Sequence, residues 1–285
     1  MTGEPGRLTL VGTPLGNRGD LSPRAREALL AADVLLCEDT RSPGRLLGEV
    51  RLPPRMSCFA GNEEERVGAV LERLAEGAQL VYVSEAGMPV WSDPGARLVR
   101  AVVDAGYALD VIPGPTAVAT AVALSGFTGS DVHFLGFPPR AGSARARLLQ
   151  RVAAAEGTTV LYEAPGRVGE LIDALAASCG PAPRRAVVAR ELTKLHQEVL
   201  RGTLSELAAT VRGRGSMRGE MTVVIEGRPS VEEAPEDDAR AAARAVWDAL
   251  HDDALKPRQR AKRIAALTGL ENRVVYEQLR ALRER

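Results

Sequence analysis

The sequence predicts an α/β protein, because short apolar runs alternate with longer amphipathic segments along most of its 285 residues. The apolar runs are continuous, as in strands that a mostly parallel sheet buries on both faces. Loops rich in Gly and Pro follow several of these runs. Hydrophobic residues make up 45% and charged residues 26%, a globular composition with ample material for a core. The length favours about two domains.

The first part of the chain alternates between expected strands and expected helices. Ser22 is a candidate N-cap, and Pro23 fits the first position of the helix that follows it. This βαβα alternation predicts a parallel sheet covered by helices. Strands are expected at 8–12, 34–38, 80–84 and from 108 to the turn at Pro113, and further helices at 65–77 and 94–105.

After Pro113 the pattern changes, and long helices become fewer. We therefore expect a mixed second sheet and place a domain boundary near Pro113, with domains at 1–113 and 114–228. Helices are expected at 116–125, 142–155 and 167–178, and strands at 132–137, 158–163, 186–191, 198–202 and 220–227, the last three divided by short helical or turn segments.

The C-terminal residues have a separate composition. Residues 229–238, PSVEEAPEDD, are acidic and poor in apolar side chains, which is typical of a linker. Residues 239–285 read as wholly helical. From position 256 onward nine Lys and Arg face three Glu, so nine minus three gives +6 over thirty residues. The overall formal charge of zero therefore conceals a basic helical module.

Three Gly/Pro loops follow three of the expected strands, at 11–17, 84–95 and 113–117. Loops after parallel strands share one edge of the sheet, where open α/β proteins bind ligands. The first loop, VGTPLGN, is neither GxGxxG nor a P-loop, so dinucleotide and triphosphate binding are unsupported. Basic residues are nearly absent, which favours a ligand of little net charge that backbone groups recognise. Thr13, Asn17, Ser84, Ser92 and Thr116 add neutral hydrogen-bonding groups.

Several classes of function are disfavoured. Cys37, Cys58 and Cys179 lie far apart and the three histidines are scattered, so a metal site is not expected. The N-terminal residues contain no long apolar run, and no segment approaches the eighteen or so apolar residues that span a bilayer. We expect a cytoplasmic protein with reduced thiols.

Six motifs occur in one order along the chain, namely VGTPLGN (11–17), LLCEDTR (35–41), SEAGMP with SDPG (84–95), IPGPTA (112–117), FLGFPPR (134–140) and ARELTKLH (189–196). Together they resemble the tetrapyrrole-methylase-fold methyltransferases, and more specifically the 16S ribosomal RNA cytidine 2′-O-methyltransferases. The resemblance runs from about Leu8 to Gly227, and ENRVVYEQL at 271–279 also resembles the C-terminal helices of that subfamily. Three departures are Arg18, Glu85 where Asp is usual, and EAPGR at 163–167 where ESPHR is common.

The resemblance implies a class III methyltransferase: two α/β domains, a ligand cleft between them that binds S-adenosyl-L-methionine, and a C-terminal helical extension. It also implies 16S rRNA of the small ribosomal subunit as substrate, and a homodimer. The expected cofactor-binding residues are Thr13, Pro14, Leu15, Gly16, Ser84, Glu85, Ala86, Gly87, Met88, Pro89, Pro115, Thr116, Ala117 and Tyr162.

Polar residues that end the expected strands are the catalytic candidates. A ribose hydroxyl is a weak nucleophile, so a base or a hydrogen-bond acceptor would help methyl transfer. Lys194 and Glu163 rank first, and Lys194 could act as a base only with a depressed pKa. Glu191 and Arg41 complete the set, and each could equally form an ordinary surface ion pair.

RNA contacts would be electrostatic first, through the basic tail and through Arg140, Arg145, Arg147 and Arg151. Aromatic residues are only 4% of the chain, so an extensive base-stacking platform is not expected. Two alternatives remain at this point. One is a methyltransferase of the same fold that acts on a corrin or siroheme precursor. The other is a catalytically inert RNA-binding protein of ribosome assembly.

Overall fold

The protein is described here from a computed structural model. It describes residues 6–127, 131–180, 182–215, 217–228, 245–247, 249–251 and 255–283. The chain divides into two compact units, Met1–Arg228 and Pro229–Arg285.

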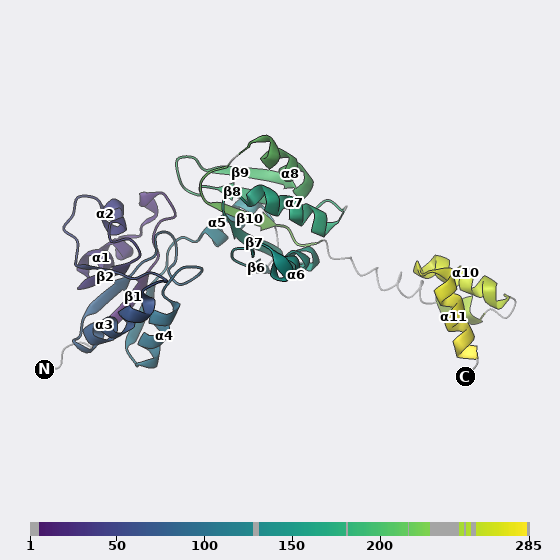
Figure 1. Ribbon diagram of the computed structural model, residues 1–285, viewed down its shortest axis with the longest axis horizontal. Coiled ribbons are helices and arrows are strands. Elements are labelled where there is room, and N and C mark those ends of the chain that lie inside the picture. Colours follow the sequence, from purple (N-terminus) through teal and green to yellow (C-terminus); the bar gives the residue numbers. More distant parts are fainter. Residues whose placement is uncertain are drawn as a thin grey trace. The chain divides into compact units, whose positions relative to one another are not determined.

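The first sheet is wholly parallel, with strand order β3-β2-β4-β1-β5. Helices α3 and α4 cover one face and α1 and α2 the other (Figure 1). Leu8, Leu36 and Leu80 are buried under α3 and α4, while Leu35 and Val81 face α1 and α2. The strands are β1 (Arg7–Val11), β2 (Val34–Cys37), β3 (Arg55–Ser57), β4 (Gln79–Tyr82) and β5 (Ala108–Ile112), and the helices are η1 (Arg18–Asp20), α1 (Pro23–Ala31), α2 (Ser42–Leu47), α3 (Glu63–Ala75) and α4 (Ala96–Asp104).

The expected start of α1 is confirmed: the Ser22 side chain accepts a hydrogen bond from the Ala25 N–H, and Pro23 lies in the first turn. Three elements were not expected, namely η1, β3 and α2. β3 contains only Arg-Met-Ser and therefore lacks an apolar run, and the six residues of α2 begin Ser-Pro-Gly, a combination more typical of a turn.

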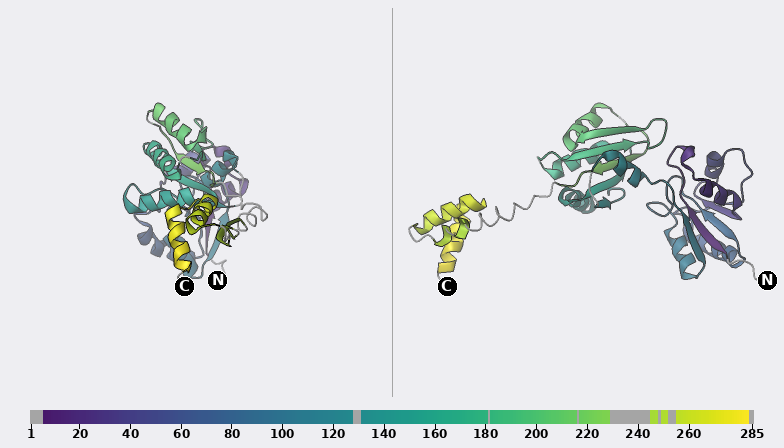
Figure 2. Two further views of the ribbon diagram at one scale, coloured as in Figure 1. Left: turned by 90° about the vertical axis from the view of Figure 1, so that its right-hand side faces the viewer. Right: turned by 180° about the vertical axis from the view of Figure 1, so that it is seen from behind.

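The second sheet is mixed, as expected, with strand order β6-β7-β10-β8-β9. β6 and β7 are parallel, whereas β10 runs antiparallel to both β7 and β8. Helices α6, α7 and α8 cover one face, and α5 covers the other (Figure 2, from other directions). The strands are β6 (Val132–Phe134), β7 (Thr158–Glu163), β8 (Arg185–Arg190), β9 (Glu198–Thr203) and β10 (Met221–Ile225), and the helices are α5 (Ala117–Ser125), α6 (Gly142–Ala154), α7 (Val168–Cys179) and α8 (Leu204–Gly213).

The C-terminal unit contains α10 (Pro257–Thr268) and α11 (Asn272–Arg283). Gly269, at φ +72°, ends α10 in the left-handed conformation that glycine adopts most readily. Ala249, Ala261, Ile264 and Val275 are buried together, so the unit has a small core of its own. The expected acidic linker at 229–238 lies outside the described residues.

Candidate functional site

Three loops meet at the carboxyl edge of the first sheet, because they follow the adjacent strands β4, β1 and β5. Thr13 and Gly87 exchange two backbone hydrogen bonds, of 2.8 and 3.1 Å. A Cβ on Gly12 would lie 2.6 Å from the Gly114 backbone, so neither glycine can be replaced without separating the loops. The Gly and Pro content of the three loops is thus explained by close backbone packing.

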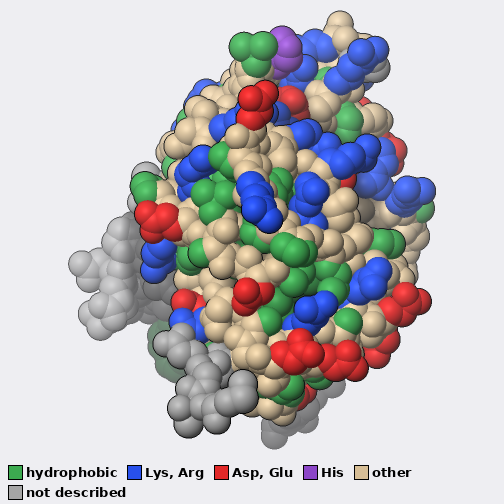
Figure 3. Space-filling view, turned by 90° about the vertical axis from the view of Figure 1, so that its left-hand side faces the viewer, with side chains coloured by type: hydrophobic (Ala, Val, Ile, Leu, Met, Phe, Trp, Pro, Cys, Tyr) green, Lys and Arg blue, Asp and Glu red, His purple; other side chains and the backbone are tan. Residues whose placement is uncertain are grey.

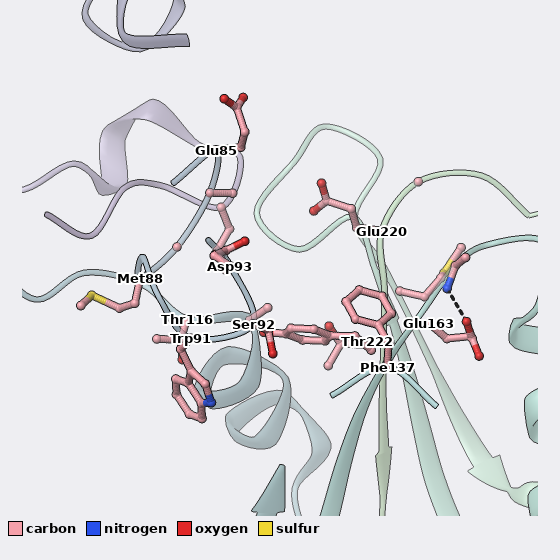
Figure 4. Close-up of a pocket in the computed structure, with 18 of the residues that line it drawn as sticks. Glu85, Met88, Trp91, Ser92, Asp93, Thr116, Phe137, Glu163, Glu220 and Thr222 are labelled. Atoms are coloured by element: carbon pink, nitrogen blue, oxygen red, sulfur yellow. Dashed lines mark hydrogen bonds between the residues drawn. The ribbon is translucent and has the colours of Figure 1, made fainter. Parts of the chain in front are cut away.

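A cavity of about 350 Å³ opens beside these loops, a volume typical of small-molecule sites. Loop residues after β4 form one wall, and residues of the second sheet form the other (Figure 4). The lining consists of Leu15, Glu85, Ala86, Gly87, Met88, Trp91, Ser92, Asp93, Thr116, Ala117, Phe137, Tyr162, Glu163, Ala164, Pro165, Gly219, Glu220, Met221 and Thr222.

The lining is acidic, which corrects the expectation of a neutral wall. It includes four carboxyl side chains, and none of its described residues is Lys, Arg or His. Such a wall favours a cationic ligand over an anionic one. Basic side chains outside the lining pair with three of the four carboxylates, and Asp93 has no ion-pair partner among the described residues. The four are Glu85, Asp93, Glu163 and Glu220.

Asp93 lies in a strained segment of the loop. Val90 and Ser92 have φ values of +76° and +64°, in the left-handed region that a β-branched residue such as valine rarely adopts. Burial is the main cause that raises the pKa of Asp93; hydrogen bonding with Ser84 opposes it, and the charges of Glu220 and Glu85 add to it. Strain of this kind is concentrated at functional sites.

Lys194 links the first loop to the second sheet. A Cβ on Gly16 would lie 2.1 Å from Cγ of Lys194, so the lysine stem packs directly on the Gly16 backbone. Its Nζ donates to Oε1 of Glu191 at 3.0 Å and contacts Oε2 of Glu220 at 3.1 Å. Burial acts to lower the pKa of Lys194, but hydrogen bonds to the two carboxylates outweigh it, and the pKa is raised. Lys194 is therefore held as an ammonium ion and does not meet the condition for a general base.

Glu191 is held in place by unusual backbone geometry. Its φ is +50°, and Thr193 follows at +63°. Its Oε1 also accepts a hydrogen bond of 2.8 Å from the Glu220 N–H. A Cβ on Gly219 would lie 2.5 Å from the Glu191 side chain, so the glycine makes room for this cluster.

Glu163 ends β7 with a fully buried side chain. Its Oε1 pairs with Arg167 at 2.5 Å and accepts a hydrogen bond of 2.8 Å from the Ala164 N–H. Its Oε2 has no hydrogen-bond partner within the described part of the chain. A buried carboxylate oxygen without a donor is costly, and it marks a position where a ligand hydroxyl could donate.

Arg41 does not line the cavity. Its side chain is 80% exposed and pairs with Asp39 at 2.9 Å. Hydrogen bonds from Arg41 hold the pKa of Asp39 well below its usual range. The Ser42 hydroxyl donates to Glu85 at 2.6 Å, so this cluster reaches the cavity only through Glu85.

Of the fourteen expected cofactor residues, the structure brings eight to the cavity lining, and the role of all fourteen stays a prediction. Thr13, Pro14 and Ser84 instead line a separate cleft of about 50 Å³ beside α1 and α2. Gly16, Pro89 and Pro115 line neither space. The eight are Leu15, Glu85, Ala86, Gly87, Met88, Thr116, Ala117 and Tyr162.

Sequence reasoning did not select several of the lining residues. Phe137 follows β6, and Ala164 and Pro165 follow β7. Trp91 and Asp93 lie within a loop already identified, and an aromatic and a carboxylate in a Gly/Pro loop could have signalled them. Glu220 and Thr222 belong to β10 or its approach, and no local pattern distinguishes them from ordinary strand residues. Only the antiparallel pairing of β10 with β7 brings them beside Glu163.

Comparison with known proteins places the chain in a family. The sequence pattern of the Tetrapyrrole (Corrin/Porphyrin) Methylases matches residues 7–208. A protein of Micromonospora olivasterospora named ribosomal RNA small subunit methyltransferase I is 39% identical over 98% of this chain and 88% of its own length. A protein of Thermotoga maritima with the same name is 41% identical over 78% of this chain and 99% of its own length.

The chain belongs to the ribosomal RNA small subunit methyltransferase I family.

Solved structures support the same fold for this family member. Cobalt precorrin-4 methyltransferase superimposes with a TM-score of 0.61 at 19% identity, over 78% of this chain and 94% of that one. Uroporphyrin-III C-methyltransferase of Thermus thermophilus, in a complex with S-adenyl homocysteine, gives 0.58 at 18% identity, over 78% and 97%. At such identities the likeness establishes the class III methyltransferase fold alone.

The described residues contain no helix that is both long and apolar enough to cross a bilayer. They also contain no group of three or more His, Cys, Asp or Glu side chains placed to hold a metal ion.

Proposed function

We propose that this protein uses S-adenosyl-L-methionine to methylate the ribose 2′-oxygen of a cytidine in 16S rRNA of the small ribosomal subunit, in the cytoplasm. The family assignment supports the reaction class. The observation that carries the proposal is the acidic cavity beside three glycine-rich loops. A cationic cofactor and a neutral ribose hydroxyl both suit such a wall.

The cavity residues fit the cofactor chemically. Its sulfonium and ammonium groups are positive, and Glu85, Asp93 and Glu220 supply negative charge. Ala86 and Gly87 also line the cavity, where the hydrogen bonds between Gly87 and Thr13 hold the loop after β4 in place. When bound, S-adenosylmethionine supplies an activated methyl group for an in-line displacement. The protein must then hold the ribose oxygen in line and accept its proton.

Glu163 is our candidate for the proton acceptor. Glu163 belongs to the cavity lining, its buried Oε2 has no hydrogen-bond partner among the described residues, and Arg167 fixes the orientation of the carboxylate through Oε1. Lys194 is our candidate for a positioning cation, because Glu191 and Glu220 hold its ammonium group at the cavity edge. Arg41 would act through Asp39 and Glu85, by setting the position of the loop after β4.

The two alternatives are less well supported. Corrin and siroheme precursors carry several carboxylates, and the described cavity lining offers no Lys, Arg or His side chain to bind them. An inert RNA-binding protein would have no use for the unpaired Oε2 of Glu163 or for the strained loop at Val90.

The test has two stages. Isothermal titration with S-adenosylmethionine should show one site, and labelled methyl should then appear on a cytidine 2′-oxygen of small ribosomal subunits. Glu163→Gln should lower turnover by about a hundredfold or more, with little change in cofactor affinity. Lys194→Met should raise KM or lower kcat by a smaller factor. If the wild-type protein binds the cofactor but transfers no methyl group to small ribosomal subunits, the proposed substrate is rejected. Full turnover by Glu163→Gln would reject Glu163 as the proton acceptor.

We also propose a homodimer formed through β5. This edge strand of a parallel sheet leaves Leu109 36% and Val111 42% exposed, and Val103 of the adjacent α4 is 51% exposed. Parallel sheets are normally covered, so a second copy would bury this edge. Sedimentation should show a dimer that Val111→Lys converts to monomer. A wild-type monomer at micromolar concentration would contradict it.

A further inference from the structure

A second hollow shares a lining residue with the cavity, but its charged lining residues are basic instead of acidic. It is an open groove of about 580 Å³, and it shares Ser92 with the cavity. The groove also includes Gly136, whose chain neighbour Phe137 lines the cavity. A chain lying in the groove could therefore present one unit to the cavity. The groove residues are Ser92, Phe134, Leu135, Gly136, Arg147, Leu148 and Arg151.

Two arginines of α6 give the groove its charge. Arg147 and Arg151 are separated by four positions, so they lie one turn apart on the same face of the helix. Both are exposed, and neither makes an ion pair or a side-chain hydrogen bond among the described residues. Arg145 of the same helix differs, because it pairs with Glu170 at 3.2 Å and its side chain is 11% exposed. Two uncompensated guanidinium groups at helical spacing suit successive phosphates.

Aromatic side chains join the groove to the cavity. The Trp91 ring meets Phe134 edge-on at 5.3 Å, and Phe134 in turn meets Tyr162 at 4.8 Å. Trp91 and Phe137 are 52% and 57% exposed, although both line the cavity. Exposed rings beside a cationic groove are the combination that single-stranded nucleic acids require, since bases stack while phosphates pair.

The two hollows differ in charge. On the face shown in Figure 3, Lys and Arg side chains gather around exposed hydrophobic ones. The cavity is acidic and the groove is basic, so a phosphate is excluded from the first and attracted by the second. This division would direct a ribose to the cavity while its flanking phosphates stay outside.

We propose that this groove binds the sugar–phosphate backbone of single-stranded RNA, with Arg147 and Arg151 contacting phosphates adjacent to the nucleotide whose ribose enters the cavity. The assignment rests on the proposed function, because it names the surface that positions the same substrate. Trp91 and Phe137 stack on bases at the cavity entrance.

The experiment compares two double variants of the full chain. Arg147→Gln with Arg151→Gln removes the groove charge. Arg24→Gln with Arg26→Gln removes the same charge from exposed positions of α1 that line neither hollow, and serves as the matched control. Cofactor affinity, from titration with S-adenosylmethionine, and melting temperature should be unchanged in both.

With small ribosomal subunits as substrate, the groove variant should raise KM by about tenfold or more and leave kcat nearly unchanged. For binding to single-stranded small-subunit RNA, the slope of log K against the logarithm of the salt concentration should become shallower by about 1.4. This value corresponds to two lost phosphate contacts at about 0.7 each. The control should match the wild type in both measurements.

Three results would overturn the inference. Equal KM and equal salt slope in the groove variant and the wild type would show that the groove does not hold RNA. Equal losses in the groove and α1 variants would show a general charge effect. Displacement of RNA by polyglutamate of matched charge would show a site for an acidic polypeptide. Failure of the proposed function can be told apart from failure of the groove assignment, because in that case the wild-type protein itself would transfer no methyl group to the subunits. The groove assignment would then also be rejected.

Discussion

At the scale of single residues, the cavity contains carboxyl groups whose burial is unfavourable for the stability of the fold. Asp93 is half-buried and lies near Glu85 and Glu220, and Glu163 is fully buried with one oxygen unpartnered. These positions favour ligand binding over the stability of the unliganded protein. A loss of stability in favour of activity is common at sites whose function requires destabilising groups.

Asp93→Asn should stabilise the unliganded protein at neutral pH. Because the native pKa of Asp93 is raised above the unfolded value of about 3.9, its protonated form confers stability that is present below that value and lost as the pH rises through the native pKa. The amide never ionises, so the melting temperature of the variant minus that of the wild type should be larger at pH 7 than at pH 4.

The same substitution should weaken S-adenosylmethionine binding at pH 7, because a charge opposite the cationic ligand is lost. Thermal scans and titrations at the two pH values provide both measurements. A difference in melting temperature that does not change with pH would contradict the assigned ionisation.

At the scale of elements, the loop after β1 contacts both the first sheet's loops and the second sheet. Leu15 packs with Val118, Val160 and Leu192 of the second sheet and its helices, while Thr13 bonds to the loop after β4. The Asn17 N–H donates to the Thr193 hydroxyl at 3.1 Å. One short loop therefore sets the position of Lys194 relative to the cavity.

Gly16→Ala should displace Lys194, because the new Cβ would lie 2.1 Å from Cγ of the lysine, and the lysine stem must move away from Glu191 and Glu220. We expect a loss of about 1–3 kcal/mol in unfolding free energy, as for other overpacked sites. Methyl transfer to small subunits should fall with it. Urea unfolding and steady-state kinetics measure the two effects.

Gly68→Ala is the matched control, since its Cβ would meet nothing within 4 Å and it lies inside α3. That change should stabilise the protein by up to about 1 kcal/mol. In a Lys194→Ala background the cost of Gly16→Ala should shrink, because the clashing stem is gone. An undiminished cost there would assign the effect to the loop backbone instead.

At the scale of the whole molecule, the chain consists of two compact units with different contents. Met1–Arg228 contains both sheets and the cavity, and Pro229–Arg285 contains the helices with their separate core. Within the second unit, the thirty residues from position 256 onward carry nine basic and three acidic side chains, a local excess of +6. The groove and this unit would then supply two separate electrostatic contacts with RNA.

Truncation after Arg228 should preserve folding and cofactor binding, since the cavity lining lies wholly within the first unit. It should weaken binding to small-subunit RNA and flatten the salt dependence of binding. If the helices only support the fold, the truncated protein would instead show a lower melting temperature and an unchanged salt slope. Melting curves and RNA titrations at several salt concentrations separate the two outcomes.

The sequence by itself determined most of the elements and the position of the ligand-binding edge. Ser22 and Pro23 mark the start of α1, and the continuous apolar strands predict a covered parallel sheet, because these signals act over a few neighbouring residues. The three Gly/Pro loops could be placed at one edge because strands of a parallel sheet end on the same side.

Only the tertiary structure decided the strand orders and the chemistry of the cavity. Glu220 and Asp93 line the same cavity, and Lys194 packs on Gly16. In both pairs the residues are more than a hundred positions apart in the sequence. The raised pKa of Lys194 depends on two carboxylates that strand pairing and positive φ values bring to it. No local pattern encodes such distances, since a side chain's ionisation depends on what surrounds it in space rather than along the chain.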